Sequence, residues 1–198
     1  MDTYNFLRSI PHPFGAANWV TFARALIAVF FLGESISLLW AGPAAGAGLR
    51  WTAVACGAAG LCLDGVDGYL ARRLGRASAF GARFDMETDA FTILALAMLV
   101  WALDQAGGWV LVSGLLRYIF VLGGWLWPIF AVPLPPRKRR QTFCVVQLVA
   151  LILALAPPVT PLWGNVICLA GLILLSYSFG VDLAWLAGQS RTKSEAVW

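Results

Sequence analysis

The chain has 198 residues, of which 60% are hydrophobic and only 12% are charged. Its mean hydropathy of +0.77 lies far above that of an average soluble domain, so the composition excludes an ordinary soluble globular protein. The net charge of +4 does not require nucleic acid, because membrane topology and attraction to anionic headgroups account for it. We expect an integral membrane protein that binds no nucleic acid.

Six apolar stretches have the length needed to cross a hydrocarbon core of ~30 Å. They lie at residues 19–41, 48–66, 86–104, 108–130, 142–158 and 162–187. The second is short and rich in alanine and glycine, which suits close packing between helices more than lipid contact. The predicted fold is all-α: a polytopic membrane protein with six transmembrane helices, forming one domain over residues 1–198.

The positive residues fix the expected orientation. With the N-terminus inside, eleven of the 14 Lys and Arg lie on the inner side. These are Arg8, Arg72, Arg73, Arg76, Arg83, Arg137, Lys138, Arg139, Arg140, Arg191 and Lys193. Only Arg50 lies in an outer loop, and Arg24 and Arg117 fall within spans. The positive-inside rule therefore predicts that both ends, residues 1–17 and 188–198, are cytoplasmic. No cleavable signal is expected before the first span.

Four aspartates lie where the second span meets the third: Asp64, Asp67, Asp85 and Asp89. The first two are three residues apart and the last two are four apart, so each pair shares one face of a helix. The glycine-rich segment between the pairs lets the chain turn back. Four carboxylates at close range repel one another, and a pair of divalent cations best relieves that repulsion. Glu87 lies two residues from Asp85 and from Asp89, hence on the opposite face, and is not expected in the site.

The same segment resembles the signature of the CDP-alcohol phosphatidyltransferases, membrane enzymes that make phospholipid headgroups. All eight fixed positions match, in the pattern Asp64-x2-Asp67-Gly68-x2-Ala71-Arg72-x8-Gly81-x3-Asp85-x3-Asp89. A second likeness to this family is Asn18-x2-Thr21-x2-Arg24 on the first span. The resemblance implies attack by an alcohol hydroxyl on a CDP-linked lipid, most often CDP-diacylglycerol, with CMP as the leaving group.

The resemblance also implies roles for single residues. Asp64, Asp67 and Asp85 would be metal ligands for two Mg²⁺ or Mn²⁺ ions, and Asp89 both a ligand and the general base. The cytidine and diphosphate would be held by Gly68, Ala71, Arg72 and Gly81, with Asn18 and Thr21. We expect a homodimer in the cytoplasmic membrane of a bacterium, surrounded by membrane lipids, with the active site facing the cytoplasm.

The resemblance implies a small alcohol as the acceptor, and the arginines near the inner face bear on its identity. They could hold the phosphate of a phosphorylated polyol such as glycerol phosphate or inositol phosphate, or serve only topology and attraction to anionic lipid. The residues expected at an acceptor site are Arg83, Arg117, Arg139 and Arg140. Ala90 follows the last aspartate, where phosphatidylglycerophosphate synthases tend to have lysine, and this disfavours glycerol phosphate.

Other interpretations remain open. Arg24 and Arg117 lie at membrane depth and should face a cavity or a partner, and a pair with Glu34 or Asp182 would be a purely structural explanation. The motif would also serve transfer from a CDP-aminoalcohol to diacylglycerol. A transporter is a further alternative, although its ionisable groups would be expected nearer the bilayer midplane. The four cysteines show no metal-binding spacing and are expected to be packing residues.

Overall fold

A computed structural model describes residues 16–46, 48–74, 79–126 and 138–195. These residues form six α-helices, together with two short 3-10 helices, and contain no strand. The α-helices are α2 (Ala16–Ala41), α3 (Leu49–Leu74), α4 (Ala79–Ala102), α5 (Leu111–Leu126), α6 (Lys138–Leu155) and α7 (Pro161–Glu195). The 3-10 helices are η1 (Pro43–Gly46) and η2 (Gly108–Val110). The prediction of an all-α fold is confirmed.

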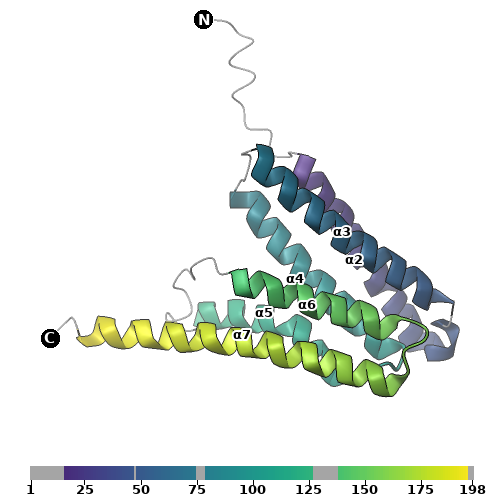
Figure 1. The fold of residues 1–198 in the computed structure, drawn as a ribbon. Helices are drawn as coiled ribbons and strands as arrows, with labels where there is room; N and C mark the ends of the chain where they lie inside the picture. Colours follow the sequence, from purple (N-terminus) through teal and green to yellow (C-terminus); the bar gives the residue numbers. More distant parts are fainter. Residues whose placement is uncertain (1–15, 47, 75–78, 127–137, 196–198) are drawn as a thin grey trace, which may run out of the picture.

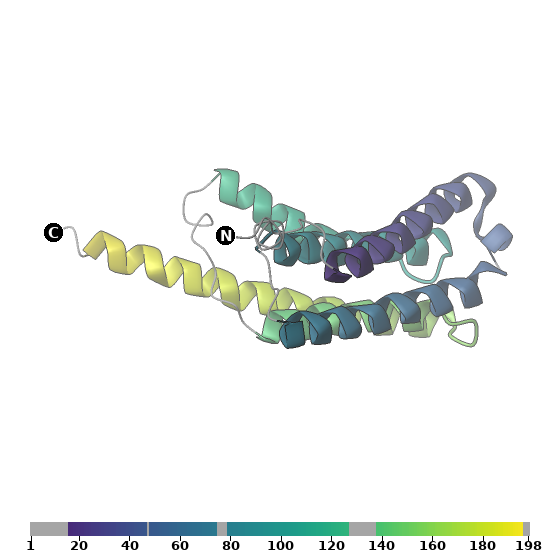
Figure 2. The ribbon, with the colours of Figure 1, turned by 90° about the horizontal axis from the view of Figure 1, so that it is seen from above.

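The helices are arranged in two layers, which Figure 2 shows from above. One layer contains α2, α4 and α5, with α4 in the middle, and the other contains α3, α6 and α7, with α6 in the middle. Between the layers α2 packs on α3, α4 on α6 and α5 on α7. Figure 1 shows that α7 extends beyond its neighbours at the end of the bundle where α3 stops and α4 starts.

The core of the bundle lies around α4 and α6. Phe31 of α2 is fully buried together with Leu96 and Leu99 of α4 and Leu151 and Leu155 of α6. Small residues allow the closest helix contacts, because a side chain at Gly114 of α5 would collide with the backbone of α4 at Leu94. Burial therefore centres on the middle helix of each layer.

Large apolar side chains also cover the outside of α2 and α7. Trp40 and Leu26 of α2, and Leu162, Trp163 and Ile173 of α7, are all more than half exposed. In the described part of the chain, Trp19–Ala41 and Pro161–Leu186 are long and apolar enough to cross a membrane. Such exposed apolar helix surface is stable against lipid and costly against water.

The connections after α2, α4 and α6 lie together at one end of the bundle, which we call the loop end. Gly42 has a φ of +86° and stops α2, with its N–H donating to the Leu38 carbonyl. Asp104 has a φ of 57° and stops α4: its own N–H donates to Trp101 and that of Gln105 to Val100, as in a Schellman motif.

Arg50, in the first turn of α3, ties these connections together. Its Nε donates to the Leu155 carbonyl at 3.0 Å, and its Nη2 donates to the carbonyls of Ala156 at 2.7 Å and Val159 at 3.0 Å. The same Nη2 lies 3.0 Å from Gln105 Oε1. A guanidinium at the C-terminal end of α6 is favoured by the partial negative charge of the last carbonyls.

Several helices extend further than the apolar stretches predicted. The second stretch was expected to end at residue 66 and the third to begin at 86, whereas α3 continues to Leu74 and α4 starts at Ala79. The fifth helix starts at Lys138, four residues before the predicted boundary. Hydropathy marks where polar residues begin, but Leu, Ala and Arg are good helix formers, so the helices continue into the polar segments.

Candidate active site

The carboxylates of α3 and α4 face each other at the end of the bundle opposite the loop end. Among the described residues, Asp64, Asp85 and Asp89 form a group in which one oxygen of each lies within 4.8 Å of the others. Asp85 and Asp89 are one turn apart on α4, and Asp64 comes from α3 across the bundle. All three are half-buried. We call these three residues the carboxylate cluster.

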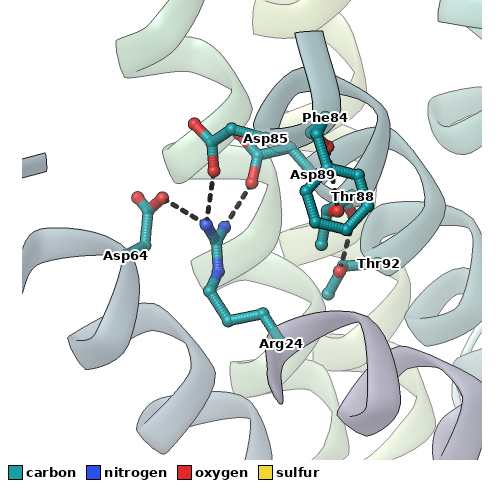
Figure 3. Close-up of polar contacts among 7 residues, drawn as sticks. All are labelled: Arg24, Asp64, Phe84, Asp85, Thr88, Asp89 and Thr92. Carbon is teal, nitrogen blue, oxygen red and sulfur yellow. Dashed lines mark hydrogen bonds and ion pairs between the residues drawn. The ribbon is translucent and has the colours of Figure 1, made fainter. Parts of the chain in front are cut away.

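Arg24 of α2 reaches into the carboxylate cluster, as Figure 3 shows. Its Nη1 lies 2.8 Å from Asp64 Oδ1 and 2.7 Å from Asp85 Oδ1, and its Nη2 pairs with Asp89 Oδ1. The Arg24 side chain is only 6% exposed. The structural explanation that Arg24 pairs with Glu34 or Asp182 is therefore wrong. The packing of α2 along α4 brings Arg24 to the aspartates, and no spacing within one helix reveals that packing.

The donors of the cluster suit a hard divalent cation. Carboxylate oxygens are the ligands that Mg²⁺ and Mn²⁺ prefer, and several negative charges in a half-buried site favour a dication. The hydroxyls beside the cluster are otherwise engaged: Thr88 Oγ1 donates to the Phe84 carbonyl at 2.9 Å and Thr92 Oγ1 to the Thr88 carbonyl at 2.7 Å. The chemistry of this donor set fits a metal centre.

Comparison with known families places the whole bundle, and not only the cluster. A family model described as CDP-alcohol phosphatidyltransferase matches residues 14–178, most of the chain. The chain belongs to the CDP-alcohol phosphatidyltransferase family. No curated protein and no solved structure gives a significant match. Membership makes the chain an enzyme that transfers a phosphatidyl or phosphoalcohol group from a CDP-alcohol in phospholipid synthesis. The family is typically dependent on divalent metal, and together with the two apolar helices it indicates a membrane protein.

The remaining signature positions of this family lie on the same two helices. Asp67, Gly68, Ala71 and Arg72 fall in the last turns of α3, but their side chains are outside the described residues. Gly81 is half-buried in the first turn of α4. The structure therefore places the eight fixed positions of the signature on α3 and α4, and the described side chains of Asp64, Asp85 and Asp89 in one cluster.

The first-helix likeness to the family maps to the start of α2. Thr21 is buried one turn before Arg24, on the same side of the helix. Asn18 lies one turn earlier, and its side chain is outside the described residues. Asn18 and Thr21 were expected to bind the nucleotide, whereas Arg24 was not placed in the site. The i, i+3 spacing puts Arg24 on the same helix face as Thr21, but only the packing of α2 on α4 brings it to the aspartates.

The arginines expected at an acceptor site take different positions. Arg83 is exposed on α4. Arg117 of α5 pairs with Glu87 on the side of α4 away from the cluster, which confirms that Glu87 faces away from the other acidic residues. Arg139 of α6 donates from Nη2 to Asp182 Oδ1 of α7 at 2.9 Å. Arg140 lies in the first turn of α6 with its side chain outside the described residues.

Proposed function

We propose that the protein transfers a phosphatidyl group from CDP-diacylglycerol to a small alcohol and releases CMP. The observation that carries this proposal is the cluster of Asp64, Asp85 and Asp89, three carboxylates from two helices within 4.8 Å in a chain of this family. In the reaction, the alcohol oxygen bonds to the lipid-side phosphorus as the bond from that phosphorus to the CMP oxygen breaks. The hydroxyl proton must go to a base.

Asp89 is the proposed base. Its carboxylate lies on α4 one turn beyond Asp85, inside the cluster, and would accept the hydroxyl proton of the alcohol. Asp64, Asp67, Asp85 and Asp89 would hold two Mg²⁺ or Mn²⁺ ions. Bound there, the ions would neutralise charge on the diphosphate and on the departing CMP.

The nucleotide would be held next to the cluster by the rest of the signature. Gly68 and Gly81 have no side chain, and Ala71 a short one, so the ligand can approach the helix backbones closely. Arg72 offers a planar fork of donors that matches phosphate oxygens. Asn18 and Thr21 would complete this site from α2, a role supported by the position of Thr21 one turn from Arg24.

Exposed apolar side chains of α2 near Arg24 support a donor that is partly lipid. Trp19, Phe22 and Leu26 are each more than 40% exposed. A CDP-lipid has a charged diphosphate next to apolar chains, and the protein offers carboxylates and an apolar surface side by side. The reverse linkage, transfer of a phosphoaminoalcohol from CDP-choline or CDP-ethanolamine to diacylglycerol, remains the second candidate.

We further propose that residues 1–198 form one membrane domain in which all six helices cross the bilayer, with both termini and the cluster on the cytoplasmic side. The 26 residues of α2 span about 39 Å, more than a ~30 Å hydrocarbon core requires. Among the described residues, eight positive residues lie in helix segments at the cluster end of the bundle, and Arg50 lies in the first turn of α3 at the loop end. The eight are Arg72, Arg73, Arg83, Lys138, Arg139, Arg140, Arg191 and Lys193. The proposed setting is the cytoplasmic membrane of a bacterium, with a homodimer as the assembly.

The acceptor we favour is a phosphorylated polyol. Arg83, Arg139 and Arg140 lie in the first turns of α4 and α6, at the same end of the bundle as the cluster. Arg117 pairs with Glu87 on the other side of α4 and is therefore left out of the proposed acceptor site. Arginine binds phosphate through paired hydrogen bonds. The ion pair between Arg139 and Asp182 would position the Arg139 guanidinium, and Arg140 would add charge beside it.

The experiment that tests this function uses the full chain purified in detergent. CDP-diacylglycerol would be incubated with Mn²⁺ or Mg²⁺ and, separately, with serine, glycerol phosphate, inositol and inositol phosphate, and CMP would be measured. A parallel reaction would contain CDP-choline and diacylglycerol. We expect CMP from CDP-diacylglycerol with a phosphorylated alcohol, and none in excess EDTA. Undiminished CMP release in EDTA would reject the metal-centred mechanism, and product from CDP-choline alone would reverse the donor assignment.

A further inference from the structure

Arg24 contacts the same carboxylate oxygens that would bind metal. The Oδ1 atoms of Asp64 and Asp85 both accept from its Nη1, and Asp89 Oδ1 pairs with its Nη2. A single guanidinium therefore engages all three members of the cluster at once, from a third helix (Figure 3). Its planar fork makes this possible, since a lysine ammonium would present one compact charge instead of two separated nitrogens.

We propose that Arg24 is an internal counter-cation that competes with the divalent metal for the carboxylate cluster. In the metal-free protein its guanidinium holds Asp64 of α3 next to Asp85 and Asp89 of α4. Metal binding displaces it from these oxygens. This inference rests on the proposed function, because it takes the cluster to be the metal site.

Charge supports the competition. Three carboxylates in a half-buried cluster repel one another, and the one positive charge of Arg24 relieves only part of that repulsion. A dication relieves more of it, but the guanidinium then becomes a like charge only a few ångströms away. At that distance, in a half-buried site, the two cations repel each other strongly. The metal could bind the second oxygen of each carboxylate while Arg24 keeps the first. The metal and the guanidinium would still lie close together, so the repulsion between them would remain.

The surroundings of Arg24 limit where it can move. A hollow next to Arg24, lined by Ile27, Phe31, Thr92 and Leu148 among others, is mostly apolar and too small to take a guanidinium. Asp85 is the most exposed member of the cluster, with 40% of its side chain exposed, so the displaced Arg24 side chain would move to that side. Thermodynamic linkage makes the effect reciprocal: Arg24 weakens metal binding by the same factor by which metal weakens the Arg24 contacts.

The test compares metal affinity in three full-length variants purified in detergent. Arg24→Met keeps a long side chain without the charge, Arg24→Lys keeps a charge without the fork, and Arg50→Met removes an arginine from the loop end as a matched control. Mn²⁺ binding would be measured by calorimetry. We expect Arg24→Met to lower the Mn²⁺ dissociation constant by about 5- to 150-fold, the usual range of coupling between two sites. Arg24→Lys should lie between this value and the wild type, and Arg50→Met should match the wild type.

Thermal unfolding provides the second readout. In EDTA, Arg24→Met should unfold at a lower temperature than the wild type, because its carboxylates have lost their counter-cation. Saturating Mn²⁺ should raise its unfolding temperature by more than it raises that of the wild type. If Arg24→Met binds Mn²⁺ no more tightly than the wild type does, the proposed competition is overturned, but the metal site is not. If Arg24→Met does not fold, the same comparison is made with Arg24→Lys. Absence of Mn²⁺ binding by the wild type would instead reject the metal site, and the inference with it.

Discussion

The two ends of the bundle each contain an arginine that bridges several helices, and the two arginines are satisfied differently. At the loop end, Arg50 donates to the carbonyls of Leu155, Ala156 and Val159 and to the Gln105 amide, all neutral acceptors. At the opposite end, Arg24 pairs with three carboxylates. The first arrangement has one net positive charge, whereas the second retains negative charge after pairing.

This difference separates structure from function. Neutral carbonyls at the end of α6 accept hydrogen bonds from a single guanidinium and leave no negative charge to be neutralised, so the Arg50 contacts serve to hold connections together. The carboxylate cluster has more negative charge than one arginine neutralises, and such a surplus favours the binding of a second cation. We therefore assign stability to the loop end and chemistry to the cluster, and each assignment can be tested by substitution.

The largest expected effect is at Asp89. Asp89→Asn should lower turnover by about 10²- to 10⁴-fold, the usual contribution of a positioned general base, while CDP-diacylglycerol affinity changes less. CMP release and donor binding would be measured in the same preparation. Glu87→Gln is the matched control, because it removes a carboxylate from the opposite face of the same helix and should retain turnover. Wild-type turnover in Asp89→Asn would remove Asp89 from the catalytic residues.

At the loop end, Arg50→Met should affect folding and leave chemistry unchanged. Removing the guanidinium leaves the last carbonyls of α6 and the Gln105 amide oxygen without their donor, at a cost of about 1–3 kcal/mol in the free energy of unfolding. Thermal or denaturant unfolding in detergent would measure the loss. The metal concentration for half-maximal activity should not change, and a shift in it would show that the two ends are coupled.

A smaller effect is expected for the acceptor. Replacing Arg139 and Arg140 together by Ala should raise the KM of a phosphorylated acceptor about tenfold, equivalent to ~1.4 kcal/mol of lost binding, with the KM of the donor nearly constant. Because Arg139 also pairs with the buried Asp182, unfolding must be measured alongside. If only unphosphorylated alcohols release CMP, the proposal of a phosphorylated acceptor is rejected, and these arginines serve only membrane topology.

The smallest effect is expected for the outer ion pair of α4 and α5. Arg117→Met and Glu87→Gln each remove the same half-exposed pair, and such pairs contribute about 0–1 kcal/mol to stability. The two single variants and the double variant should therefore unfold within about 1 kcal/mol of the wild type. A larger loss that appears in both single variants would make this pair comparable to the Arg50 contacts.

The sequence predicted what depends on local spacing. Asp85 and Asp89 share a helix face because they are four residues apart, and Asp64 of the preceding helix α3 lies opposite them. The six apolar stretches correspond in order to the six α-helices of the described residues. Glu87 was expected to point away from the other acidic residues, and it contacts Arg117.

What the sequence could not provide are contacts between helices that are not adjacent in the chain. Arg24 meets the aspartates because α2 packs along α4, and Asp182 meets Arg139 because α6 packs along α7. Neither packing has a periodicity of its own. Helix ends were also misplaced, since hydropathy falls at residue 66 while α3 continues to Leu74.

The most direct test of the central claim is Mn²⁺ binding by the purified full chain. Electron paramagnetic resonance would measure it, because the signal of free Mn²⁺ decreases as the ion binds during a titration. The wild type should bind Mn²⁺, and Asp64→Asn, Asp85→Asn and Asp89→Asn should each weaken that binding, because each removes a charged ligand. Glu87→Gln and Arg50→Met should bind as the wild type does. Equal Mn²⁺ affinity in the wild type and all three aspartate variants would contradict the assignment of the metal site to the carboxylate cluster.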